Sequence, residues 1–208
     1  MVQKSVSSEA KRRGRPRAYD PAVAIEQAAA VFWKAGYAGT SLDDLAAATG
    51  MNRPSLYAAF GDKRELYLKT LEFYRTRNRD LIKRALAGEP PLRELLQRIY
   101  AGALDIYYAG DDGARGCYTI GTATTVAAVD EGVREFLAQS FSSTDAFFFQ
   151  HIVAAQKRGE ISAPADPAAL AALTTATLHT LAVRSRAQVP RAELEKIVTS
   201  ALAVICAK

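Results

Sequence analysis

Residues 40–63, TSLDDLAAATGMNRPSLYAAFGDK, constrain the fold of this chain more than any other stretch. The side-chain oxygen of Ser41 can cap a first helix, and Gly50 permits the left-handed turn that ends it. Asn52 can then cap a second helix, whose first turn tolerates Pro54 because the missing N–H has no helical partner there. We therefore predict two short helices joined by a tight turn.

The second of these helices has distinct inner and outer faces. Leu56 and Phe60 are four residues apart and face inward, whereas Arg53, Ser55 and Tyr57 face outward. Two helices, a glycine turn and a polar, basic outer face are typical of a helix-turn-helix unit. An ordinary helical hairpin satisfies the same spacing, so this stretch alone leaves both interpretations open.

Positive charge is concentrated in the first part of the chain. The net charge of the 208 residues is +5, but residues 1–87 contain 16 Lys/Arg and 9 Asp/Glu, whereas residues 88–208 contain 11 and 13. This division indicates that only the first part meets a polyanion. The segment KRRGRPR at 11–17 makes residues 1–18 a flexible basic arm. Such an arm is either solvated or, through Arg15 and Arg17, inserted into a narrow minor groove.

The rest of the chain also has helical patterns. Apolar spacing, capping residues and Pro/Gly signals predict further helices over 20–35, 62–86, 92–109, 130–158, 167–185 and 190–207. The uncharged stretch 116–129 contains β-branched residues typical of a strand, but no second strand is available to pair with it, so a buried helix is favoured. The prediction is an all-α fold of about nine helices. The helix over 62–86 has apolar residues on more than one face and is expected to belong to both halves of the protein.

Composition excludes several protein classes. Two cysteines are too few for a disulfide framework, and nothing resembles a signal peptide. The longest run without Asp, Glu, Lys or Arg, residues 167–183, is short and rich in Ala and Thr, which makes it a poor membrane span. We expect a cytoplasmic protein that makes no membrane contact.

A dispersed set of residues extends over the whole N-terminal part of the chain: GRPR, Ala24-Ile25, Ala28, Phe32, Gly36-Tyr37, Thr40-Ser41, Leu45-Ala46, Gly50, Ser55-Leu56-Tyr57, Phe60 and Lys63. In this set the chain resembles the TetR family of bacterial transcriptional repressors. The resemblance implies a homodimer with a three-helix DNA-binding domain over 19–78 (motif 41–60) and a helical domain over 79–208 that dimerises and binds an effector. The implied function is a ligand- or redox-responsive repressor of a palindromic double-stranded operator, without enzymatic activity, metal or other cofactor.

The same resemblance assigns DNA contacts to individual residues. Arg53, Pro54, Ser55 and Tyr57 fall in the recognition helix, and Thr40 and Lys63 fall on phosphate-contacting positions. Arg53 can donate two hydrogen bonds to a guanine edge, whereas Thr40, Tyr57 and Lys63 suit the backbone. A solvated lysine is the alternative for Lys63. The two alanines after Tyr57 stand where family members often carry larger or polar side chains, so we expect few base contacts.

Six residues are candidates for the wall of an effector pocket: Tyr100, Tyr107, Cys117, Phe141, Phe148 and His179. Aromatic residues at helical spacing also fit an ordinary core. Arg115-Gly116-Cys117 is similar to a family subgroup with Gly-Cys at the start of helix 6, some of whose members respond to electrophiles or oxidants through that cysteine. A helix N-terminus would lower the pKa of the Cys117 thiol, although a small buried residue is the alternative reading.

Two other functions compete with a regulator. A non-specific DNA-organising protein, dominated by the basic arm, would bind any duplex with similar affinity. A cysteine-dependent enzyme would use Cys117, but no histidine lies nearby in the sequence and no catalytic signature is present. The two isolated histidines, His151 and His179, make neither a metal site nor a convincing catalytic pair.

Overall fold

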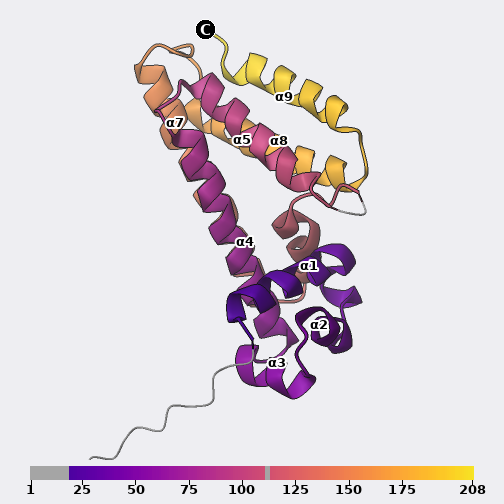
Figure 1. Ribbon diagram of the computed structural model, residues 1–208. Helices are drawn as coiled ribbons and strands as arrows, with labels where there is room; N and C mark the ends of the chain where they lie inside the picture. The colour runs from indigo at the N-terminus through magenta and orange to yellow at the C-terminus, as the bar shows by residue number, and fades with distance from the viewer. Residues whose placement is uncertain (1–18, 111–112) are drawn as a thin grey trace, which may run out of the picture.

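The computed structural model describes residues 19–110 and 113–208. These residues form an elongated, all-helical molecule in which the first three helices lie at one end and a long helix connects them to the other end (Figure 1). The predicted all-α fold is confirmed. The elements are α1 (Pro21–Gly39), α2 (Leu42–Thr49), α3 (Arg53–Phe60), α4 (Lys63–Leu86), α5 (Leu92–Tyr107), the π-helical η1 (Thr119–Ala123), α6 (Thr124–Val126), α7 (Glu131–Lys157), α8 (Pro167–Arg186) and α9 (Arg191–Ile205).

Helix α1 begins where the sequence predicts, and its regular part ends at the predicted position. The carboxylate of Asp20 accepts the N–H of Ala22 at 2.8 Å, and Pro21 occupies the first position. The chain leaves helical geometry at Gly36, with φ of 74° and ψ of 171°, before a short continuation to Gly39. A positive φ of this size favours glycine, which explains why the regular helix ends there.

Helix α4 connects the two ends of the molecule (Figure 1). It starts with a capping box, in which Asp62 accepts the N–H of Glu65 at 2.8 Å and Glu65 accepts the N–H of Asp62 at 3.0 Å. Its first turns bury Leu66 and Leu71 in the core around α1, whereas Ala85 belongs to a second core around α5 and α8. The expectation that this helix belongs to both halves is confirmed.

A helix, and not a strand, forms within residues 116–129. Its first part is the π-helix η1, which the sequence analysis did not predict. The hydroxyls of Tyr67 and Thr122 lie 2.7 Å apart, and those of Thr70 and Tyr118 lie 2.6 Å apart. These buried hydrogen bonds fasten the segment to α4, so part of the core around α1 comes from residues far along the chain.

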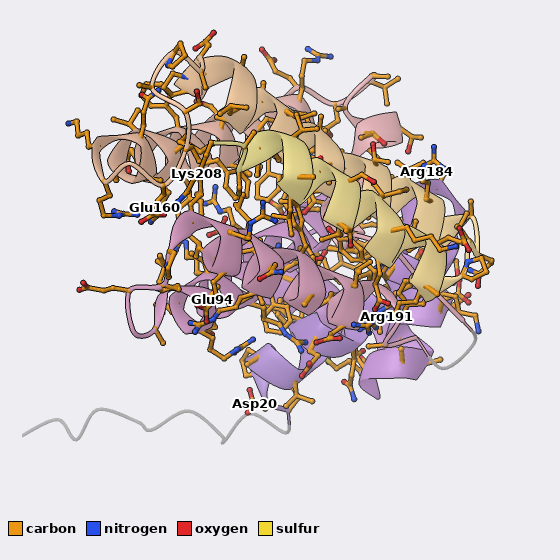
Figure 2. The ribbon with its side chains drawn as sticks, turned by 90° about the horizontal axis from the view of Figure 1, so that it is seen from above. Asp20, Glu94, Glu160, Arg184, Arg191 and Lys208 are labelled. Carbon is orange, nitrogen blue, oxygen red and sulfur yellow. The ribbon has the colours of Figure 1, made fainter. Side chains whose placement is uncertain are left out.

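The far end of the molecule is closed by the last helices. The predicted helix over 92–109 is shorter than expected, because α5 ends at Tyr107, whose carbonyl accepts the N–H of Arg115 at 2.8 Å. Figure 2, which looks down on this end, shows α9 lying across the molecule and Glu160 close to Lys208. Glu160 also accepts the N–H of Leu92 at 2.7 Å, which supplies the N-terminus of α5 with a capping acceptor.

Candidate functional site

The α2–turn–α3 unit is held in shape by its capping residues. Ser41 and Asp44 form a capping box at the start of α2, and Gly50 ends this helix in the left-handed conformation with φ of 64°. The side chain of Asn52 accepts the N–H of Ser55 at 2.9 Å at the start of α3. Leu56 is buried in the core around α1, as predicted. Short helices of this length are marginal alone, so these caps and this burial fix the unit.

The outer face of α3 carries the predicted DNA-contacting residues. Arg53, Pro54 and Tyr57 are exposed, and Ser55 is half-buried. Tyr57 is a large aromatic side chain with 46% of its surface exposed. A face that is polar, basic and aromatic suits contact with a polyanion and its bases.

Arg53 is bound to a carboxylate on the neighbouring helix. Its Nε donates to Oδ1 of Asp43 on α2 at 2.7 Å, and its Nη2 donates to Oδ2 of the same carboxylate. This hydrogen bonding lowers the pKa of Asp43, which therefore stays ionised at neutral pH. The sequence analysis missed the pair. It means that the donors Arg53 would use on a guanine are held by Asp43 in the free protein.

The two predicted phosphate-contacting residues, Thr40 and Lys63, differ in how far they are buried and in what they contact. Thr40 is buried, and its hydroxyl donates to the carbonyl of Gly36 at 2.7 Å, so it must release this bond to donate to a phosphate. Lys63 is half-buried, with Nζ 4.5 Å from the centre of the Tyr37 ring. Burial lowers the pKa of Lys63. The other two predicted contacts, Arg15 and Arg17, lie outside the described residues.

A cavity of about 530 Å³ lies between α4, α5, η1, α7 and α8, which is a suitable size for a small molecule. Five of the six predicted pocket residues line it: Tyr107, Cys117, Phe141, Phe148 and His179. Tyr100 does not line it, because this residue is fully buried against α8, with its hydroxyl donating to the carbonyl of Thr174 at 3.2 Å. The sequence analysis missed the polar residues that α4 contributes, namely Arg75, Asn78, Arg79 and Lys83.

The environment of Cys117 favours the alternative of a small packed residue over that of a sensor. Burial raises the pKa of its thiol, and this outweighs the hydrogen bonds from the nearby backbone, which lower it. The hydroxyl of Tyr74 donates to its sulfur at 3.6 Å. The lowering expected from the helix N-terminus is therefore present but outweighed, and the net shift of this pKa is upward. His179, whose ring centre lies 5.1 Å from that of Phe141, has its pKa lowered by burial.

Two kinds of feature are absent from the described residues. No group of three or more His, Cys, Asp and Glu side chains within 19–110 and 113–208 could hold a metal ion. Across the same ranges, no helix is both long and apolar enough to cross a membrane.

Two family profiles match the chain. The profile described as "Bacterial regulatory proteins, tetR family" matches residues 24–70, and the one described as "Tetracyclin repressor-like, C-terminal domain" matches residues 89–201. Together they cover the α2–α3 unit and the α5, η1, α7 and α8 sides of the cavity. The chain belongs to the TetR family of bacterial regulatory proteins.

Individual members of the TetR family support this assignment along the whole chain. The HTH-type transcriptional repressor ComR of Escherichia coli is 29% identical over 95% of this chain and 92% of its own length. The uncharacterized HTH-type transcriptional regulator YezE of Bacillus subtilis is 31% identical over 72% of this chain and 76% of its own length. Both relatives are named as transcriptional regulators.

A solved structure shows the same TetR arrangement bound to DNA. A cysteine mutant of the TetR family regulator CifR, complexed with 26-base-pair operator DNA, superposes with a TM-score of 0.81. It is 32% identical to this chain and covers 91% of it, while this chain covers 98% of CifR. The sequence-based prediction of a TetR-family regulator is therefore confirmed.

Proposed function

We propose that this protein is a repressor that binds a palindromic DNA operator as a homodimer. A small molecule bound in the cavity between α4, α5, η1, α7 and α8 controls it. In this proposal Arg53, Pro54, Ser55 and Tyr57 enter the major groove, with Arg53 as the principal base-reading residue. The operator complex of CifR and the repressor ComR support it. Lys63 and Thr40 would contact phosphates, and Arg15 and Arg17 the minor groove.

The observation that carries the proposal is the course of α4. Asp62 and Lys63, at its N-terminus, lie directly after the recognition helix α3, and its later turns line the cavity through Tyr74, Arg75 and Arg79. A helix moves as a rigid element, so a ligand that displaces its later turns also displaces the start, and with it α3. The two recognition helices of a dimer would then lose the spacing that the two half-sites of a palindromic operator require.

An exposed apolar surface supports the homodimer. On α8, Leu173 is 39% exposed and Val183 is 58% exposed, while Val204 on α9 is 60% exposed. Ala172 and Ala176 are also exposed on α8 and permit close approach of a second helix. Apolar residues of this size gathered on the last two helices are best covered by a second copy of the same surface.

The test is a binding measurement with competing DNA. Wild-type protein and Arg53→Ala are titrated with operator duplex and with a shuffled duplex of equal length. We expect the wild type to prefer the operator and the variant to lose at least about tenfold of that preference, since a bidentate contact to guanine contributes strongly to discrimination. Equal affinity of the wild type for both duplexes would favour a non-specific DNA-organising protein.

A further inference from the structure

One face of α4 places three cations along the wall of the cavity. Arg75, Arg79 and Lys83 are spaced four residues apart, so they form one stripe on the helix, with Asn78 and Ile82 between them. All five of these residues line the cavity. We refer to Arg75, Arg79 and Lys83 as the cation stripe.

The cavity wall contains no compensating carboxylate. Among its lining residues, all of which lie in the described part of the chain, there is no Asp or Glu. Two cations of the stripe have partners outside the wall, since Arg75 binds Glu72 at 2.5 Å and Lys83 binds Asp80 at 3.4 Å. Arg79 has no ion-pair partner within residues 19–110 and 113–208. The wall therefore has an excess of positive charge.

Arg75 has a buried donor without an acceptor. Its Nε is shielded from solvent and makes no hydrogen bond, while its guanidinium carbon lies 5.2 Å from the centre of the Phe136 ring. A buried N–H without an acceptor costs free energy, and native proteins rarely keep one without a reason. This nitrogen is shielded from the cavity as it stands, so it reaches an anion there only after the Arg75 side chain reorients.

The remainder of the cavity wall is apolar with a row of hydroxyls. Its floor is made by buried residues of α5 and α7: Ile99, Ala103, Tyr107 and Phe148. The α7 side adds Ser140, Ser143 and Thr144, which can hydrogen-bond a polar substituent. Arg79, Lys83 and Ser143 are exposed, so the charged and hydroxyl groups lie towards solvent. The apolar residues lie deeper inside.

We propose that the effector is an amphipathic organic anion, a carboxylate or sulfonate bound by Arg75 and Arg79 with its apolar body against Ile99 and Phe148. This inference rests on the proposed function, because it names the chemical class of the small molecule that controls the regulator. A carboxylate or sulfonate accepts from guanidinium donors through short, charge-assisted hydrogen bonds. A neutral molecule of equal shape would leave Arg79, the one cation of the stripe without an ion-pair partner among the described residues, uncompensated.

The test compares two fluorescent probes of nearly equal shape and different charge. Anilinonaphthalene sulfonate is an amphipathic anion, and phenylnaphthylamine is its neutral counterpart. Both are titrated into the full-length wild type, Arg75→Gln, Arg79→Gln and Arg84→Gln. Arg84 is the matched control, because it is an exposed arginine on the same helix that does not line the cavity.

We expect the anion to bind the wild type at least about tenfold more tightly than the neutral probe. Arg75→Gln and Arg79→Gln should each lose most of this preference while binding phenylnaphthylamine as tightly as the wild type does. Arg84→Gln should retain the preference. Equal binding of the two probes, or an equal loss in Arg84→Gln, would overturn the inference. Arg79 is exposed, so its substitution leaves the core intact.

Operator binding measured in the same samples separates this inference from the proposed function. If the neutral probe binds as well as the anion and also weakens operator binding, the cavity controls the regulator but the ligand class is wrong. If the anion binds through Arg75 and Arg79 and operator affinity is unchanged, the ligand class is right and the regulatory role of the cavity fails.

Discussion

The guanidinium of Arg186 on α8 donates a hydrogen bond to the main-chain carbonyl of Trp33 on α1, at 3.2 Å. The same nitrogen donates at 3.2 Å to the carbonyl of Arg115, which also accepts the indole N–H of Trp33 at 3.1 Å. The guanidinium carbon of Arg115 lies 3.9 Å from the centre of the Trp33 ring. Helix α1, which lies at the end of the molecule that holds the α2–α3 unit, is thus connected to the part around the cavity by α8 as well as by α4.

We predict that Arg186→Ala lowers the free energy of unfolding by about 1–3 kcal/mol, because two part-buried carbonyls lose a charged donor. Chemical denaturation checks this value. Arg184→Ala is the control: Arg184 is exposed on the same helix and labelled in Figure 2, and its loss should change stability by less than about 0.5 kcal/mol. Equal effects of the two substitutions would contradict a specific role for Arg186.

The pair of Asp43 and Arg53 leads to a prediction about DNA affinity. Asp43→Asn removes the carboxylate that holds Arg53 and one negative charge near the DNA-facing surface. We expect operator affinity to rise about two- to fivefold, the modest size typical of an exposed ion pair. The measurement is fluorescence anisotropy with a labelled operator duplex at fixed salt.

The double variant Asp43→Asn/Arg53→Ala provides the control for this effect. The gain from Asp43→Asn should largely disappear when Arg53 is absent, because there is then no side chain to release. A gain of the same size in the Arg53→Ala background would show that general charge, and not the pair, sets the effect.

Lys63 leads to a prediction about the salt dependence of binding. If its ammonium contacts a phosphate, Lys63→Gln should weaken binding to the operator and to the shuffled duplex by the same factor. It should also reduce the slope of log affinity against log salt by about 0.9. Lys69→Gln is the control, since Lys69 is exposed on another face of α4. An unchanged slope for Lys63→Gln would leave Lys63 as a lysine that only packs on Tyr37.

Local signals made the helix-turn-helix unit predictable from sequence. The caps at Ser41 and Asn52 and the turn at Gly50 depend on neighbouring residues only, and the structure has all three. The pair of Asp43 and Arg53 depends on the angle between two helices, which spacing along one helix does not contain. The sequence therefore does not predict this pair, although both residues lie within 40–63.

Tertiary packing explains the errors around the cavity. Helical spacing placed Tyr100 on the apolar face of α5, but that face is wide enough to meet both the cavity and α8, and Tyr100 meets α8. The cation stripe was visible as three basic residues at intervals of four. Which surface it lines depends on where α5 and α7 pack against α4, and this could not be read from the stripe itself.

The pKa of Cys117 yields a prediction that separates a packed thiol from a sensor. Because burial raises this pKa above the ordinary value of 9.0, the reactive thiolate is scarce at neutral pH. Raising the pH increases the thiolate fraction, so the rate of alkylation by iodoacetamide should rise about tenfold per pH unit from pH 7 to pH 9 without levelling off. At pH 7 the rate should lie below that of free cysteine.

This measurement is made in a Cys206→Ser background, since burial also raises the pKa of the Cys206 thiol. The same protein unfolded in urea is the control, and its Cys117 should react like a free thiol, which shows that folding and not sequence suppresses the reaction. A rate that levels off below pH 8 would mean that the folded protein stabilises the thiolate. In that case a redox or electrophile response through Cys117 would regain support, and the burial of this thiol would not be the feature that governs its chemistry.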